Sequence, residues 1–292
     1  MDRYLQVFVT VAEKGSFSRA AEEHHMTQPA VSQYIRTFED MMGERLLERN
    51  NRYVRLNKAG ELVYYYAKEI LGLYTKMGNL VDDLKNKASG PLSIGASYTF
   101  GEYVIPRIIA DLLELYPDIQ PTVTIGNTAR IAELVAKHQL DIGIVEGHFS
   151  DHQLMEEPFA KDNMVVVASP DHHLARQEEV KIEDLEKETW IIRETGSGTR
   201  EVTDKLFSEF KLAPTQFMYF SSTQPIKESV EAGLGISLFS EWAIQKELKY
   251  GALKVIKVKG LPLTRKFSIV TSSPYRTKAM EVFIELLHLK TH

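Results

Sequence analysis

The 292-residue sequence contains no cysteine. A disulfide framework, a cysteine-ligated zinc site and a thiol nucleophile are therefore excluded. Long apolar runs are missing too: no stretch approaches the length of a membrane span, and the first residues lack the apolar run of a signal peptide. From these absences we expect a soluble, cytoplasmic protein that does not contact a membrane.

The motifs of common enzyme classes are also missing. There is no G-x-S-x-G nucleophile elbow, no H-E-x-x-H motif and no P-loop, and the GSGT run at 196–199 lacks the lysine and spacing of a phosphate-transfer loop. The nine histidines show no metal-ligand spacing beyond two adjacent pairs, His24-His25 and His172-His173, which are typical of turns. We therefore predict a protein that is not an enzyme, with no catalytic residue, no metal site and no cofactor.

The composition is that of globular domains, with 43% hydrophobic and 26% charged residues. The net charge of −5 is unevenly distributed along the chain. Residues 45–58 hold five basic residues and one acid, Glu48. A basic segment on an acidic chain is typical of a nucleic-acid contact, although short charge runs are more often solvated faces.

The first part of the chain predicts two short helices joined by a tight turn. The first helix covers about 18–23, and the turn covers 24–26. Thr27 suits the N-cap of the second helix and Pro29 its first turn, and this helix runs over about 28–40. Its apolar residues recur at the spacing of one buried helical face: Val31, Ile35 and Phe38.

The opposite face of the second helix carries side chains that can hydrogen-bond base edges or phosphates: Gln28, Ser32, Gln33 and Arg36. An ordinary helical hairpin would explain two helices and a turn, but the next segment argues against it. Asn50-Asn51 is a turn dipeptide between two short arms that contain Arg49, Arg52 and Arg55, as in a β-wing. Asn57 is then placed to cap a long helix. These features predict a winged helix-turn-helix, in which wing arginines contact the DNA backbone.

A long helical pattern without proline follows over 58–88 and ends at Gly90-Pro91, which predicts a linker. Apolar residues recur along it at spacings of three and four, close to a heptad repeat: Leu62, Tyr66, Ile70, Leu73, Met77, Leu80 and Leu84. Such a stripe packs either on a second copy of the helix or on the chain's own globular part. We favour a dimerisation helix, because a two-fold dimer reads a pseudo-palindromic site.

From Leu92 onward, short apolar runs alternate with amphipathic helical patterns, which predicts an α/β domain with mostly parallel strands. Ligands of such sheets bind beyond the carboxyl ends of the strands, and hydroxyls and free N–H groups at helix N-termini suit an anion. A serine, threonine or asparagine in front of a helix, taken alone, is more often a helix cap than a ligand contact. Glu146 would oppose an anion unless it is paired, for example with Arg200. The candidates are Ser97, Tyr98, Thr99, Asn127, Thr128, Glu146, Ser197, Gly198, Thr199, Arg200, Ser222 and Thr223.

The N-terminal residues resemble the DNA-binding domain of LysR-type transcriptional regulators. The resemblance rests on FSRAA (17–21), TQPAVSQ (27–33), Gly43, LLER (46–49) and LNKAGE (56–61). His24, Leu47 and Asn57 stand where the family usually has leucine, phenylalanine and threonine. The run ETGSGTR (194–200) resembles the CysL-like and CbbR-like branch of the family, whose effectors are small anions or phosphorylated metabolites.

The resemblance implies three parts. A mainly α-helical winged helix-turn-helix domain would cover residues 1–58, a linker or dimerisation helix 59–90, and an α/β two-lobed effector domain of the periplasmic-binding-protein type 91–292. Lobe one would comprise 91–161 and 267–292, and lobe two 162–266, with hinges near the two crossovers. The implied DNA contacts are Thr27, Gln28, Pro29, Ala30, Ser32, Gln33, Arg36, Arg49 and Arg52.

The resemblance further implies a sequence-specific transcriptional regulator whose small, anionic effector binds between the two lobes. Its partners would be double-stranded DNA, a second copy of the chain in a homodimer or homotetramer, the effector and, in an activator, RNA polymerase. The alternative is a solute-binding protein that uses the α/β lobes alone. That function would require export, and the missing signal peptide and residues 1–58 argue against it.

Overall fold

The computed structural model describes residues 2–49, 53–82, 88–147 and 153–291. They form two compact units, one of Met1–Val81 with Lys137–Gln139 and one of Asp82–Ala136 with Leu140–His292. Within the described residues, no helix combines the length and the apolar character that crossing a membrane requires.

The first unit contains three short helices, a two-stranded wing and a long helix. Its elements are α1 (Asp2–Lys14), α2 (Phe17–Glu23), α3 (Gln28–Met42), β1 (Leu47–Arg49), β2 (Val54–Leu56) and α4 (Lys58–Asp82). The two predicted helices and the wing are confirmed in their order, and α3 extends slightly beyond its predicted end. Four residues of the sequence predictions lie outside the described residues: Asn50, Asn51, Arg52 and Leu84.

Local signals begin and end these helices where the sequence predicts. Thr27 Oγ1 accepts the N–H of Ala30 at 3.4 Å, and α3 ends at Gly43, whose φ of 73° favours glycine. Asn57 Oδ1 accepts the N–H of Gly60 at 2.7 Å. Asn57 therefore caps α4 as predicted.

The predicted apolar face of α3 forms the centre of the first unit's core. Val31, Ile35 and Phe38 are at most 1% exposed, and Phe38 packs on Phe8 of α1. One side of α4 joins this core through Ala67. The predicted stripe on its other side is 41–61% exposed at five positions: Leu62, Tyr66, Ile70, Leu73 and Met77. The stripe therefore does not serve the core of its own unit.

The second unit is an α/β structure with one seven-stranded and one two-stranded sheet. Its strands are β3 (Gly90–Ser97), β4 (Ile119–Gly126), β5 (Ile142–Glu146), β6 (Met155–Ala168), β7 (Thr189–Arg193), β8 (Gln216–Phe220), β9 (Ser237–Ser240), β10 (Lys254–Val255) and β11 (Leu263–Thr271). Its α-helices are α5 (Tyr98–Tyr103), α6 (Ile105–Leu115), α7 (Thr128–Ala136), α8 (Gly198–Glu209), α9 (Thr223–Glu231), α10 (Gln245–Tyr250) and α11 (Lys278–Thr291). The described residues also form the 3₁₀ helices η2 (His173–Arg176), η3 (Ile182–Lys187) and η4 (Glu241–Ala243).

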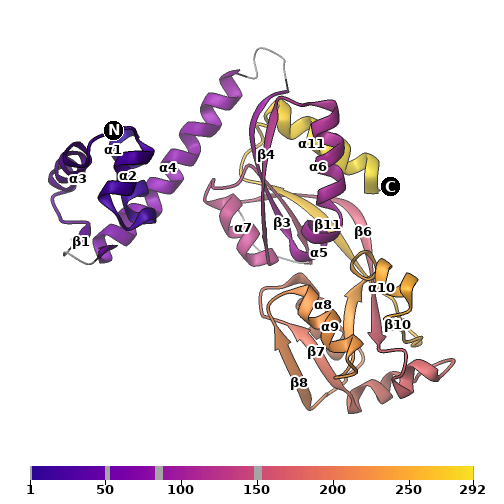
Figure 1. The fold of residues 1–292 in the computed structure, drawn as a ribbon. Helices are drawn as coiled ribbons and strands as arrows, with labels where there is room; N and C mark the ends of the chain where they lie inside the picture. The colour runs from indigo at the N-terminus through magenta and orange to yellow at the C-terminus, as the bar shows by residue number, and fades with distance from the viewer. Residues whose placement is uncertain (1, 50–52, 83–87, 148–152, 292) are drawn as a thin grey trace. The chain divides into compact units, whose positions relative to one another are not determined.

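The main sheet is mixed rather than mostly parallel. β3 pairs in parallel with β4 and β5, as β7 does with β8. The long strands β6 and β11 are antiparallel to each other and connect the two halves of the unit (Figure 1). The expectation of mostly parallel strands is wrong here, because the two connecting strands run in opposite directions through one sheet.

The predicted linker is also shorter than expected. β3 begins at Gly90, and Pro91 pairs with Gln120 of β4. β5 joins β3 only from Ile94 to Ala96. Proline, which has no N–H, is tolerated at the start of this strand because one side of the strand is not yet paired there.

Separate apolar clusters divide the unit into two halves, which we call lobe one and lobe two. Phe159 of β6 and Phe267 of β11 belong to the core that contains β3, α6 and α11. Further along β6, Met164 belongs to the core that contains β7 and α8. The strands β6 and β11 pass from lobe one to lobe two at Asp162 and Arg265, which lie opposite each other in the β6–β11 register.

Candidate DNA-reading and effector sites

The first candidate site is the exposed side of α3. Gln28, Gln33 and Arg36 are exposed, and Ser32 is half-buried. Gln28 Nε2 donates to Ser32 Oγ at 3.0 Å, and Gln33 Nε2 donates to Thr37 Oγ1 at 3.4 Å. The other predicted contacts at the start of the helix are exposed or half-buried: Thr27, Pro29 and Ala30. One solvent-facing side of α3 thus presents amide, hydroxyl and guanidinium groups.

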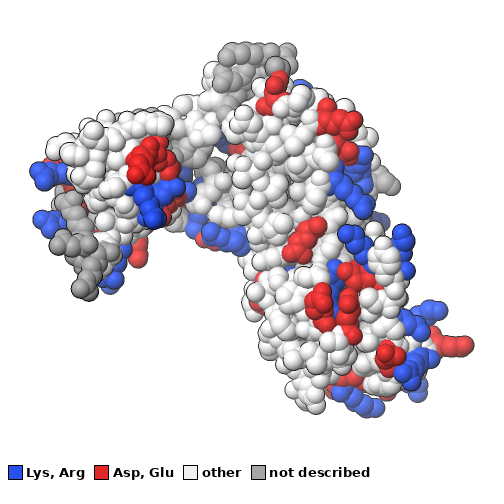
Figure 2. All heavy atoms as spheres, viewed as in Figure 1, with Lys and Arg blue, Asp and Glu red and all other residues white. Residues whose placement is uncertain are grey.

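The wing follows this helix. Arg55 Nη2 lies 2.6 Å from Glu48 Oε2, and its guanidinium lies 4.9 Å from the centre of the Tyr53 ring. The charge of Arg55 is therefore paired within the wing. Of the two predicted wing contacts, Arg49 lies in β1, whereas Arg52 lies outside the described residues. In the view of Figure 2, basic and acidic side chains are interspersed over this unit.

Glu39, which the sequence analysis did not select, ties the wing to α3. Its side chain is buried, and its Oε1 accepts the N–H groups of Leu46 at 2.9 Å and Leu47 at 3.2 Å. The sequence signal that could have identified Glu39 is its position: this acid stands four residues after Ile35, at the spacing of the buried apolar face. Glu39 therefore positions the wing beside α3.

Replacing Glu39 by alanine is expected to lower the free energy of unfolding by about 1–3 kcal/mol, because two buried backbone N–H groups lose their acceptor. Urea unfolding followed by circular dichroism measures the change. Asp40→Ala is the matched control, since Asp40 is exposed on the same helix. Equal stability of the two variants would mean that the wing N–H groups do not depend on Glu39.

His24, one of the departures from the resemblance, makes a defined polar contact. Its Nε2 lies 2.9 Å from Thr10 Oγ1 on α1. Burial lowers the pKa of His24, and the charge of Arg3 lowers it further. The imidazole is therefore neutral near pH 7 and hydrogen-bonded, and it does not leave an unpaired charge where α1 and α2 meet.

The second candidate site lies at the carboxyl ends of the lobe-one strands. Ser97 Oγ donates to Glu146 Oε2, and Thr99 Oγ1 lies 3.2 Å from Glu146 Oε1. Thr128 Oγ1 donates to the backbone oxygen of Glu146 at 2.8 Å. All four side chains are at most 3% exposed. Predicted residues from three separate segments thus meet at one buried residue, Glu146.

Arg265 of β11 pairs with this carboxylate. Its Nη1 lies 3.5 Å from Glu146 Oε1, and its Nε lies 2.7 Å from Asp162 Oδ2 on the neighbouring strand β6. Nη2 donates to Thr99 Oγ1 and Nη1 to Thr199 Oγ1, both at 3.1 Å. One buried guanidinium therefore joins hydroxyls of both lobes at the crossover between them. Arg265 and Asp162 were not predicted, because each stands inside an ordinary strand pattern.

Arg200, by contrast, does not pair with Glu146. Its Nε lies 2.8 Å from Asp204 Oδ1, one turn along α8, and its Nη1 donates to the backbone oxygen of Arg193 at 3.2 Å. The suggested pairing of Arg200 with Glu146 is wrong, because the carboxylate faces β11 instead. Ser197 is the N-cap of α8, and its Oγ accepts the N–H of Arg200.

Lobe two contributes a second buried arginine, Arg193 at the end of β7. Its Nε and Nη2 lie 2.8 Å and 2.9 Å from the two carboxylate oxygens of Glu194, and its guanidinium lies 4.4 Å from the centre of the Tyr98 ring. Asn127 of lobe one donates to Glu194 at 3.1 Å. Burial alone would raise the pKa of Glu194, but the hydrogen bond from Arg193 holds it below its usual value.

The two lobes touch closely at this site. Ala129 of lobe one donates its N–H to the backbone oxygen of Gly196 at 3.2 Å. A Cβ at Gly198 would lie within 2.1 Å of the backbone oxygen of Glu146, so only glycine fits at the start of α8. The predicted loops from the two lobes therefore do converge, although each was selected separately in the sequence.

A small polar cavity lies beside these contacts. Its polar lining consists of Thr99, Arg193, Thr199, Thr203, Thr223, Ser237 and Ser240. Its volume of about 10 Å³ is enough for one water molecule. Of the predicted effector residues, Thr99, Thr199 and Thr223 line this cavity. Ser222 stands next to it as the N-cap residue of α9. In this conformation the lobes are closed on the site.

Family models match almost the whole chain. Residues 3–61 match the bacterial regulatory helix-turn-helix protein of the lysR family, and residues 85–290 match the LysR substrate binding domain. The chain is 36% identical over 284 residues to the HTH-type transcriptional regulator CysL of Bacillus subtilis, covering 97% of this chain and 95% of the relative. It is 35% identical to the regulator CbbR of Rhodospirillum rubrum over 92% of this chain and 89% of the relative. These relatives are regulators rather than enzymes.

Solved structures agree with this assignment. Full-length OxyR from Pseudomonas aeruginosa is 25% identical with a TM-score of 0.75, covering 99% of this chain and 98% of that one. The CcmR regulatory domain from Synechocystis PCC6803, in complex with 2-PG, is 26% identical with a TM-score of 0.63, covering 70% of this chain and 98% of that one. The helix-turn-helix match disfavours the solute-binding alternative. The chain belongs to the LysR family of transcriptional regulators, sequence-specific DNA-binding proteins that a small-molecule effector controls.

Proposed function

We propose that this regulator binds a small anion between its two lobes and that the bound anion changes how a homodimer or homotetramer presents its DNA-reading helices. The observation that carries the proposal is the lining of the polar cavity. Four threonines and two serines surround one buried cation, Arg193, and no carboxylate is among the lining residues. Hydroxyl donors and a guanidinium in a dry site suit a carboxylate, sulfate or phosphate group.

Glu146 belongs to the closed conformation rather than to the anion site. Its carboxylate is held by Arg265 and by the hydroxyl of Ser97, and it is not among the residues that line the cavity. We therefore assign it a positioning role in lobe one. The relative CcmR, whose regulatory domain was solved with 2-PG, supports a small-molecule ligand for this kind of domain.

The cavity has no room for a metabolite while the lobes are closed. The effector must therefore bind an opened form, and it shifts the equilibrium between lobe arrangements by its differential affinity for them. The hinge would be the β6–β11 pair near Asp162 and Arg265, close to the proposed division of the lobes at 161/162 and 266/267. In an activator, the same shift would present the DNA-bound dimer to RNA polymerase.

Replacing Thr199 or Thr223 by valine is expected to weaken anion binding by about 1.5–3 kcal/mol, because a charged ligand loses a hydroxyl donor. A thermal-shift screen of sulfur metabolites and sugar phosphates selects the anion, and calorimetric titration measures its affinity. Thr195→Val is the matched control, since Thr195 is exposed on the same loop and does not line the cavity. Unchanged affinity in both test variants would place the effector elsewhere.

A second test addresses DNA reading. Gln33→Ala and Arg36→Ala are expected to relax preference at particular base pairs of the operator by about 1–3 kcal/mol, because these side chains face outward from the reading helix. Arg49→Ala is expected to weaken binding to all DNA sequences. It should also lower the slope of log affinity against log salt concentration by about one unit, because one phosphate contact is lost. Gel shifts with upstream DNA and single-base variants, with and without residues 1–58, measure both effects. If a wing variant changed base preference while the helix variants did not, the assignment of base contacts to α3 and of phosphate contacts to the wing would be refuted.

A further inference from the structure

We propose that lobe two carries a site for a divalent transition-metal ion, formed by His172, His173 and Glu188. The site is separate from the polar cavity, whose lining includes none of these three residues. It is therefore independent of the proposed anion site. His172 and His173 stand at the start of η2, and Glu188 is the residue between η3 and β7.

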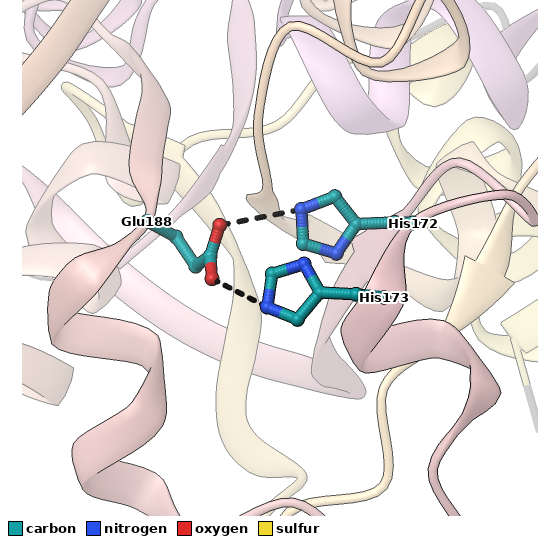
Figure 3. A group of neighbouring side chains, drawn as sticks. All are labelled: His172, His173 and Glu188. Atoms are coloured by element: carbon teal, nitrogen blue, oxygen red, sulfur yellow. Dashed lines mark ion pairs between the residues drawn. The ribbon is translucent and has the colours of Figure 1, made fainter.

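The three side chains converge with the spacing of metal ligands. Both imidazoles point toward the carboxylate in Figure 3. His172 Nε2 lies 3.3 Å from Glu188 Oε2, and His173 Nε2 lies 3.1 Å from Glu188 Oε1. One candidate ligand atom from each residue lies within 4.8 Å of the others. The two imidazole distances run to different oxygens of the Glu188 carboxylate. An ion held by one of these oxygens would draw the three ligand atoms together, to the separation of roughly 3.3 Å that bonds of about 2.0–2.1 Å at tetrahedral angles give.

The burial of the three residues suits a site that is fixed on one side and open on the other. The side chains of His172 and Glu188 are 12% and 14% exposed, whereas that of His173 is 66% exposed. The two imidazole rings lie 4.6 Å apart with their planes 31° from parallel. The exposed ring leaves a path for the ion and a fourth position for water, as in sites with three protein ligands.

The chemistry of the ligands selects the class of metal. Two imidazoles and one carboxylate favour Zn²⁺, Ni²⁺ or Cu²⁺ over Mg²⁺ and Ca²⁺, which prefer sites made of oxygen atoms alone.

Metal binding has one local cost. His172 Nδ1 accepts the N–H of Leu174 at 3.3 Å, so the proton of the neutral ring is on Nε2. A metal at Nε2 moves that proton to Nδ1 and ends this hydrogen bond. At 3.3 Å, the bond is longer than the usual 2.7–3.2 Å. His172 nevertheless caps η2, so the test uses variants of the other two ligands.

The test titrates the full-length chain, prepared without a histidine tag and stripped with a chelator, with ZnCl₂ and separately with MgCl₂ by calorimetry. We expect one Zn²⁺ per chain and much weaker binding of Mg²⁺. His173→Ala and Glu188→Gln are each expected to weaken Zn²⁺ binding by at least about tenfold. Mutating a residue that only hydrogen-bonds a metal ligand already lowers metal affinity by about that factor. His25→Asn is the matched control: it alters the other adjacent histidine pair, and asparagine tolerates the φ of 53° at that position.

Three results would overturn the proposal: no Zn²⁺ binding, equal affinity in wild type and both variants, or equal affinity for Mg²⁺. Circular dichroism of each metal-free variant separates the loss of a ligand from the loss of the fold. If Glu188→Gln does not fold, His173→Ala decides the question, because its side chain is largely exposed and its removal leaves the cap of η2 intact.

Discussion

Replacing Arg265 by methionine is expected to lower the free energy of unfolding of the second unit by about 3–5 kcal/mol, because removing one partner leaves buried charges without compensation. Arg265 is 3% exposed, and the carboxylates of Asp162 and Glu146 beside it are 0% and 2% exposed. A methionine of similar length fills the space but cannot offset either negative charge. Urea unfolding of the variant and the wild type measures the loss.

The chain provides a matched control for this change. Arg276 forms an ion pair with Glu157 at 2.6 Å, but both side chains are at least 33% exposed. Arg276→Met should therefore cost no more than about 1 kcal/mol, the value of a surface pair. Adding Asp162→Asn and Glu146→Gln to Arg265→Met should restore part of the lost stability, because the buried charges are removed together. Equal effects of the two methionine variants would mean that the buried network does not hold the lobes.

Introducing aspartate at both Leu73 and Met77 is expected to abolish the dimer and specific DNA binding while both units stay folded. These side chains are 47% and 56% exposed in a single chain, so the substitutions leave the chain's own core intact. In a dimer packed along this stripe, the two charges would be buried without a partner, which costs several kcal/mol. Light scattering measures the oligomeric state, and a gel shift measures operator binding.

The same helix offers a control with equal added charge. Thr75 and Gly78 lie away from the stripe on α4; Thr75 is exposed, and a Cβ at Gly78 would meet no atom within 4 Å. Aspartate at these two positions should leave the oligomer and DNA binding unchanged. An intact dimer in the Leu73→Asp, Met77→Asp double variant would exclude this face of α4 as the dimer contact.

The N-terminal unit was largely predictable because its signals are local. The N-cap Thr27 and the apolar period of Val31, Ile35 and Phe38 lie within one helix, and Asn57 caps the helix that follows it directly. Hydrogen bonds of this kind join residues three or four apart, so the chain order itself brings the partners together. Glu39 was missed because its partners, Leu46 and Leu47, lie in the next element.

The candidate effector site was predictable only in part. The loops that contain Ser97, Thr128 and Thr199 could be selected, because ligands of α/β sheets bind beyond the carboxyl ends of strands. The ionic partner of Glu146 could not be selected. Arg200 stood beside a candidate loop and was preferred, whereas Arg265 lies inside a strand more than one hundred residues from Glu146.

Periodicity and caps act over a few residues, so the amino-acid sequence predicted the two helices and the wing of the first unit, the polar face of α3, the apolar stripe of α4 and the family. Which charges meet depends instead on contacts between distant parts of the chain. The antiparallel register of β6 and β11 brings Asp162 opposite Arg265, and the packing of the two lobes carries Arg265 to Thr99, Thr199 and Glu146. Such pairings depend on strands that are distant in the chain and adjacent in the sheet, and no local pattern encodes them.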